Sequence, residues 1–165
     1  MTKRTYPTCA TTRRGLLAGA GALLLAAQFP ARAQPARFAE VWKDPDCGCC
    51  KDWIAHLEAN GFKVKVNDSG REAIARKLGV ERKYGSCHTA LIGGYAIEGH
   101  VPAREIARLL KDRPQAVGLA VPGMPVGTPG MDAPVYGGRK DSYDVLLLAR
   151  DGSAKVYQHY EGKKS

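Results

Sequence analysis

The chain has 165 residues, 44% of them hydrophobic, and a formal net charge of +9. Its basic residues form no dense stripe interleaved with aromatic side chains, so nucleic acid is not expected as a main partner. Five of the basic residues and no acidic ones lie within residues 1–33, which leaves +4 for the remainder. That remainder is long enough for one domain with its own hydrophobic core.

The first 33 residues have the pattern of a cleaved export signal. A basic stretch precedes an apolar run over residues 16–29, which is too short and too rich in Gly and Ala to span a bilayer. Residues 31–33, Ala-Arg-Ala, match a cleavage site. The Arg13-Arg14 pair resembles a twin-arginine signal, and a Sec signal fits as well. We expect a mature domain over residues 34–165, located in a bacterial-type periplasm and without a stable membrane span.

The mature chain alternates predicted strands and helices. Apolar periodicity predicts strands over residues 39–43, 62–66, 89–92, 95–98, 143–148 and 154–159, and helices over residues 49–60, 69–78 and from Pro102 onward. Asp46 is the expected cap of the first helix, and Ser69 to Glu72 has the capping-box spacing. The Gly/Pro-rich residues 118–138 are expected to form a long ordered loop before a C-terminal β-hairpin.

This order of elements resembles the thioredoxin-like fold over residues 39–112. Cys47 and Cys50 stand where that fold has its C-x-x-C, at the first turn of the first helix. Cys87, His88 and a threonine stand where it usually has a residue, a cis-proline and a threonine. The resemblance implies a single α/β domain in which these two segments face one another, so that Cys87 lies beside the cluster Cys47-Gly48-Cys49-Cys50.

Four cysteines that converge in this way favour a soft metal ion. A helix N-terminus lowers the pKa of a thiol because it favours the anion, and thiolates select Cu(I) over harder ions. The tight Cys-x-Cys-Cys spacing also favours sulfurs that bridge several cuprous ions. The expected ligands of this copper site are Cys47, Cys49, Cys50 and Cys87.

Other interpretations of the cysteines stay open. Zinc sites usually draw their ligands from two separated C-x-x-C pairs, so zinc is less favoured than copper. Cys47 and Cys50 would be the catalytic residues of a thiol–disulfide oxidoreductase, with Cys49 or Cys87 as the resolving thiol. A domain stabilised by zinc or by two disulfides, without a redox role, is the third alternative.

Further soft or nitrogen donors lie near the cysteines or in the Gly/Pro-rich loop. His88 is a candidate ligand or proton acceptor because it follows Cys87 directly. Met124 and Met131 are thioethers in the loop and are candidate ligands or parts of a lid. We expect His100 to be a loop or helix-capping residue and His56 to lie on a solvated helix face.

Four motifs together resemble the CopG-type periplasmic copper-resistance family, whose domain was long described as one of unknown function. They lie within residues 44–50, 85–89, 98–103 and 118–125. The resemblance implies a thioredoxin-like fold and copper binding through the four cysteines. It leaves open whether the protein is an oxidoreductase, a buffer or a delivery factor. The expected partners are copper ions and a periplasmic copper chaperone, exporter or oxidase.

Overall fold

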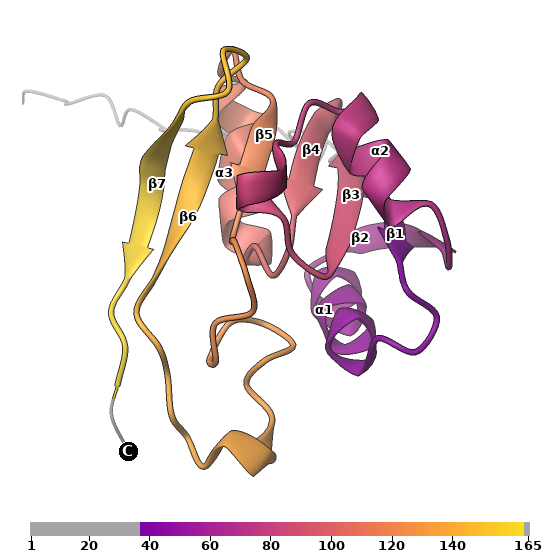
Figure 1. Cartoon of the computed structure of the whole chain (residues 1–165). Coiled ribbons are helices and arrows are strands. Elements are labelled where there is room, and N and C mark those ends of the chain that lie inside the picture. The colour runs from indigo at the N-terminus through magenta and orange to yellow at the C-terminus, as the bar shows by residue number, and fades with distance from the viewer. Residues whose placement is uncertain (1–36, 164–165) are drawn as a thin grey trace, which may run out of the picture. The chain divides into compact units, whose positions relative to one another are not determined.

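The computed structural model describes residues 37–163, which form a mixed α/β domain around a seven-stranded sheet (Figure 1). The expected export signal lies outside these residues. The strands are β1 (Arg37–Lys43), β2 (Phe62–Asn67), β3 (His88–Ile92), β4 (Tyr95–Glu98), β5 (Gly118–Ala120), β6 (Tyr143–Leu148) and β7 (Ala154–Tyr160). The helices are α1 (Gly48–Ala59), α2 (Arg71–Lys77) and α3 (Ala103–Asp112), with short 3₁₀ turns η1 (Arg82–Tyr84) and η2 (Pro134–Tyr136).

The sheet has the strand order β2-β1-β3-β4-β5-β6-β7. The pairs β1–β2 and β4–β5 are parallel, and the other neighbouring pairs are antiparallel. A parallel pair needs a crossover connection, and α1 and α3 supply these two crossovers. The strands predicted over residues 89–92 and 95–98 form the hairpin β3–β4 around the Gly93-Gly94 turn, and the predicted C-terminal hairpin is β6–β7.

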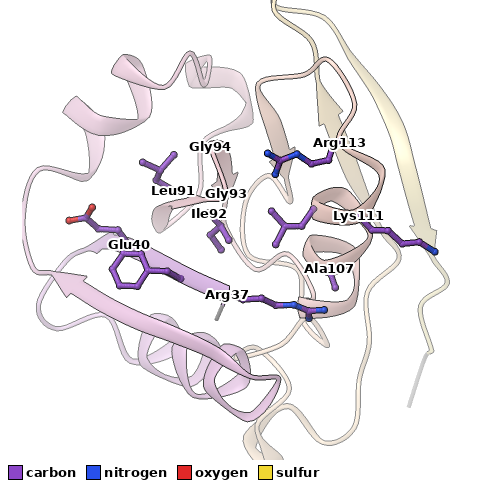
Figure 2. A pocket seen from close by; sticks show the side chains of 11 residues that line it. Arg37, Glu40, Leu91, Ile92, Gly93, Gly94, Ala107, Lys111 and Arg113 are labelled. Carbon is purple, nitrogen blue, oxygen red and sulfur yellow. The ribbon is translucent and has the colours of Figure 1, made fainter. Parts of the chain in front are cut away.

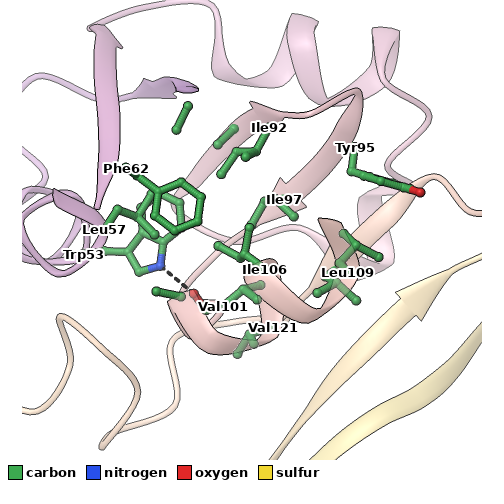
Figure 3. Packing of buried hydrophobic residues seen from close by; sticks show 14 of the residues in the cluster. Trp53, Leu57, Phe62, Ile92, Tyr95, Ile97, Val101, Ile106, Leu109 and Val121 are labelled. Carbon is green, nitrogen blue, oxygen red and sulfur yellow. Dashed lines mark hydrogen bonds between the residues drawn. The ribbon is translucent and has the colours of Figure 1, made fainter. Parts of the chain in front are cut away.

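The hydrophobic core lies mainly between the sheet and the helices α1 and α3 (Figure 3). Trp53 and Leu57 of α1 and Ile106 of α3 are fully buried there. The indole N–H of Trp53 donates to the Val101 carbonyl at 2.9 Å, so the largest core side chain has its polar atom satisfied. A smaller cluster on the opposite face includes Val80 and packs against α2. The described residues contain no helix with the length and apolarity of a membrane span.

Three local expectations differ from the structure. Cys47, not Asp46, is the N-cap of α1, and its sulfur accepts from the Cys50 N–H at 3.3 Å. Gly70, with a φ of 79°, precedes α2 without any side-chain cap bond, so the expected capping box is absent. Strand β5 was not predicted, because it is three residues long and lies within the predicted loop.

His56 connects the two helices that cover the main core. The Ala103 N–H at the start of α3 donates to His56 Nε2 at 3.1 Å, and the imidazole is partly buried. The interpretation of His56 as a solvated side chain was therefore wrong. Burial lowers its pKa, while the charge of Asp132 opposes this shift.

We predict that His56→Ala reduces the pH dependence of stability. Because the pKa of His56 is lowered in the folded protein, the unfolded chain binds a proton more readily below about pH 6.5. The stabilising contribution of neutral His56 is thus present above that pH and is lost as the pH falls. Urea unfolding between pH 7.5 and 5 should show a smaller loss of stability in the variant than in the wild type.

The exposed His159 provides the control, because its hydrogen bond to Asp144 raises its pKa. A raised pKa contributes stability below the unfolded pKa and loses it as the pH rises. His159→Ala should therefore change the pH profile in the opposite direction. Identical profiles for wild type and His56→Ala would contradict the assigned role of His56.

Candidate metal centre

The pairing of β1 with β3 brings the two cysteine-bearing segments together. These strands are antiparallel, and Lys43 at the end of β1 pairs with His88 at the start of β3. The chain leaves β1 towards Cys47 and enters β3 from Cys87. Both segments therefore lie at the same end of the sheet.

Four sulfur atoms meet at this end. Cys47 and Cys50 form a disulfide, whereas Cys49 and Cys87 are free thiols. The Cys49 sulfur lies 3.6 Å from that of Cys47 and 4.0 Å from that of Cys87. All four sulfurs are within 4.8 Å of one another. The structure thus brings together the four cysteines of the predicted metal site.

Two buried imidazoles approach the Cys87 sulfur. His88 Nδ1 lies 3.3 Å and His100 Nε2 3.1 Å from it, and the three residues form a second group with converging ligand atoms. The His88 ring also packs on Trp53 with 4.2 Å between ring centroids. His100 does lie in a loop, as interpreted, but its contact with Cys87 was not anticipated. No sequence motif predicts the contact between His100 and Cys87, because it depends on how the loop after β4 packs.

Burial holds these groups in their neutral forms. Burial, and then the neighbouring Cys49, raises the pKa of the Cys87 thiol to about 12. Burial, and then the neighbouring His100, lowers the pKa of His88 to about 3, and burial also lowers the pKa of His100. A cation that binds here would displace the thiol proton, because the thiolate is the metal-binding form.

A buried lysine fixes the segment that leads to the cysteines. Lys43 is 3% exposed, and its ammonium donates to the carbonyls of Asp44 at 2.9 Å and Pro45 at 3.3 Å. It also forms an ion pair with Asp68 at 2.8 Å. Three partners therefore restrain the chain just before Cys47. The sequence predicts only a strand at Lys43, since nothing in the neighbouring residues distinguishes this side chain from a surface lysine.

A buried carboxylate restrains the segment around Cys87 from the α2 side of the sheet. Glu98 is fully buried and accepts from the Ser86 N–H at 2.7 Å and the Thr89 hydroxyl at 2.6 Å. Arg71 donates to the Ser86 carbonyl at 3.1 Å. Burial raises the pKa of Glu98, although these hydrogen bonds oppose the shift. Hydrogen bonds from Arg71 and to Glu98 thus restrain the chain just before Cys87 at Ser86, and a second bond to Glu98 also restrains it after Cys87 at Thr89.

The two candidate methionines lie in the loop after β5. Met124 is 52% exposed. Met131 is buried, and its sulfur accepts from the Tyr136 hydroxyl at 3.6 Å. The same loop reaches the cluster through the Pro129 carbonyl, which accepts from His100 Nδ1 at 2.8 Å.

A pocket of about 650 Å³ lies at the other end of β1 and β3 (Figure 2). Its lining includes Arg37 at the start of β1, Leu91 near the end of β3 and the Gly93-Gly94 turn. Among the residues that the structure describes, no cysteine or histidine lines it. The candidate metal ligands therefore lie in the packed cysteine and histidine cluster and not in this pocket.

Comparison with solved structures gives two matches at 50% sequence identity. One, copper resistance protein CopG in form 1, has a TM-score of 0.72 and covers 78% of this chain and 100% of its own. The other, form 2 of CopG, has a TM-score of 0.70 and covers 76% of this chain and 99% of its own. The chain belongs to the CopG family. The family assignment made from the four motifs is therefore confirmed.

A family model described as a protein of unknown function, DUF411, matches residues 84–131. The matched segment of this CopG-family chain contains Cys87, His88 and His100, but not the cysteines of α1. No curated protein matches the chain. The protein is thus a homologue of a copper resistance protein, and it carries a cysteine and histidine cluster able to bind a metal.

We predict that Lys43→Met destabilises this CopG-family domain by about 1–3 kcal/mol, because it removes the donor to two backbone carbonyls. Lys65→Met is the matched control, since Lys65 forms an exposed ion pair with Glu40. The control should stay within about 0.5 kcal/mol of the wild type. Urea unfolding measures both, and equal effects would contradict the restraining role of Lys43.

Proposed function

We propose that this protein binds Cu(I) through cysteine thiolates in the periplasm and acts in copper resistance or copper handling. The observation that carries the proposal is the convergence of four sulfurs and two imidazoles from segments far apart in sequence. Thiolate and imidazole ligands suit cuprous ions, whereas carboxylate and water ligands would suit harder cations. The copper resistance protein CopG, which is 50% identical, supports the choice of copper over zinc.

The donor set fits a copper cargo once the disulfide is reduced. A dithiol reductant, itself oxidised to a disulfide, would transfer two electrons and two protons to the Cys47–Cys50 disulfide and give two thiols, which adds two sulfur donors to Cys49 and Cys87. His88 Nε2 is buried and has no hydrogen-bond partner among the described residues. The nitrogen of this ring that faces the sulfurs is Nδ1, 3.3 Å from the Cys87 sulfur, so Nδ1 is the atom that would bind the ion.

We extend the proposal to the fold type and the location. The strand order β2-β1-β3-β4, with β1 and β2 parallel and β3 and β4 antiparallel, supports a thioredoxin-like core to which β5, β6 and β7 are added. The Cys47–Cys50 pair at the first turn of α1 supports the same assignment. The pattern of residues 1–33 supports export to the periplasm.

We predict that the reduced chain binds Cu(I) with a stoichiometry of at least one ion, and that bound copper protects its thiols from alkylation. Cys87→Ser should lower the Cu(I) affinity at least about tenfold, because this sulfur contacts both Cys49 and the imidazoles. An anaerobic titration against a chromogenic Cu(I) chelator measures the affinity.

The control is His159→Asn, which alters an exposed histidine that pairs with Asp144. It should leave the Cu(I) affinity unchanged, and circular dichroism should show that Cys87→Ser keeps the fold. Unchanged affinity in Cys87→Ser would remove this sulfur from the site. Purification with one tightly held zinc that Cu(I) fails to displace would favour the zinc-stabilised alternative.

Thiol–disulfide exchange is a second candidate function, favoured by the disulfide at the N-terminus of α1. A substrate thiolate would attack one sulfur of the Cys47–Cys50 bond and form a mixed disulfide, releasing the other sulfur as a thiolate. Attack by the second substrate thiol would then leave a reduced pair and an oxidised substrate. The first-turn amides favour the released thiolate, because the helix N-terminus stabilises an anion.

An insulin reduction assay distinguishes the two functions. If exchange is the main activity, the copper-free chain should catalyse insulin reduction by dithiothreitol at thioredoxin-like rates, and Cys47→Ser should abolish the catalysis. If copper binding is the main activity, the copper-free chain should be a poor catalyst. Rapid catalysis together with weak Cu(I) binding would overturn our first proposal.

A further inference from the structure

The loop after β5 is attached to the metal centre at two places. Near its start, the Gly123 N–H donates to the Gly85 carbonyl at 3.3 Å, and the Gly123 carbonyl accepts from the Ser86 hydroxyl. Farther along, the Pro129 carbonyl accepts from His100 Nδ1 at 2.8 Å. We call residues 123–131 the strap. Its two attachments lie on the residues just before Cys87 and on the histidine that contacts Cys87.

The strap approaches α1 so closely that only glycine fits at residue 130. A Cβ on Gly130 would lie 2.6 Å from the Cys49 carbonyl oxygen and 2.8 Å from the Trp53 nitrogen. Both are backbone atoms of α1, which cannot move aside as a flexible side chain would. The φ of 87° at Gly130 also disfavours a side chain there. A substitution must therefore lift the strap away from the centre.

The hydrogen bond to the strap determines which nitrogen of His100 carries the proton. A carbonyl oxygen only accepts, so Nδ1 must be the protonated nitrogen. Neutral imidazole then has its lone pair on Nε2, and this atom lies 3.1 Å from the Cys87 sulfur. Metal-binding histidines usually donate their other ring N–H to a carbonyl or carboxylate in this way, which fixes the tautomer and the ring orientation.

We propose that the strap is the positioning element of the metal centre. The Pro129 carbonyl, held in place by the close approach of Gly130 to α1, fixes His100 as the Nδ1–H tautomer and presents its Nε2 lone pair to an ion bound by Cys87. Pro129 and Gly130 act through His100 and are positioning residues. The inference rests on the proposed function, since it explains how one nitrogen donor of the same site is held in position.

The first test is the tautomer of His100 in the wild type. Long-range ¹H–¹⁵N correlation spectra of the reduced, metal-free full chain report the protonated nitrogen of each imidazole. The chain has only four histidines, and His100→Asn assigns the relevant signals. The expected result is the Nδ1–H tautomer for His100. An Nε2–H tautomer would overturn the proposal without any assumption about copper.

The second test compares Gly130→Ala with Gly138→Ala. Gly138 lies in the same loop and has a similar φ of 78°, but a Cβ there meets nothing within 4 Å. The two variants thus share the backbone strain, and only Gly130→Ala should displace the strap. It should give mixed tautomers at His100 and a Cu(I) affinity about 10–100-fold lower, whereas the control should match the wild type in both respects.

The outcomes separate this inference from the proposed function. A Gly130→Ala chain with an unchanged His100 tautomer would overturn the positioning role, whatever its affinity. Equal changes in Gly130→Ala and Gly138→Ala would also overturn it, because strain alone would then explain them. A wild type that fails to bind Cu(I) would contradict the proposed function, while the tautomer spectra would still decide the role of the strap.

Discussion

The antiparallel register of β1 and β3 is the constraint on which the metal centre depends. By pairing Lys43 with His88, it places the end of one strand beside the start of the other. The sulfurs of Cys49 and Cys87 are 38 residues apart in sequence, yet they lie within 4.0 Å. A shift of one residue would turn the side chains of β3 to opposite faces of the sheet, and His88 would then leave the face that carries α1. The core therefore specifies the site, because the same register buries Ala90 and Ile92.

Around this constraint, polar groups in low-dielectric surroundings hold each segment in position. The buried Lys43 restrains the chain before Cys47, and the buried Glu98 restrains the chain before Cys87. Such groups are costly to bury unless they are fully hydrogen-bonded, so each gives a specific local geometry and not merely added stability. The loop after β5 completes the arrangement by contacting His100. Burial keeps Cys87, His88 and His100 neutral, and a cation that binds there would displace the thiol proton so that its charge is balanced by the thiolate.

The sequence was sufficient for the main features of this fold and for the cysteines of the site. Apolar runs separated by the glycine turns at Gly93-Gly94 and Asp151-Gly152 located both hairpins, and the order of elements indicated that Cys87 would meet the cysteines of α1. The contributions of His100 and Lys43 could not be predicted, because a buried histidine or lysine has the same local sequence signal as an exposed one. The short strand β5 could not be predicted for a related reason. It forms because it pairs with β4 and β6, and not because its own residues have a high β-strand propensity.

X-ray absorption at the copper K-edge of the reduced chain loaded anaerobically with copper tests the central claim most directly. We expect an edge characteristic of Cu(I) and nearest neighbours that are predominantly sulfur, with a minor nitrogen contribution from imidazole. A Cu(II) edge under these conditions, or nearest neighbours made only of nitrogen and oxygen, would contradict the thiolate site.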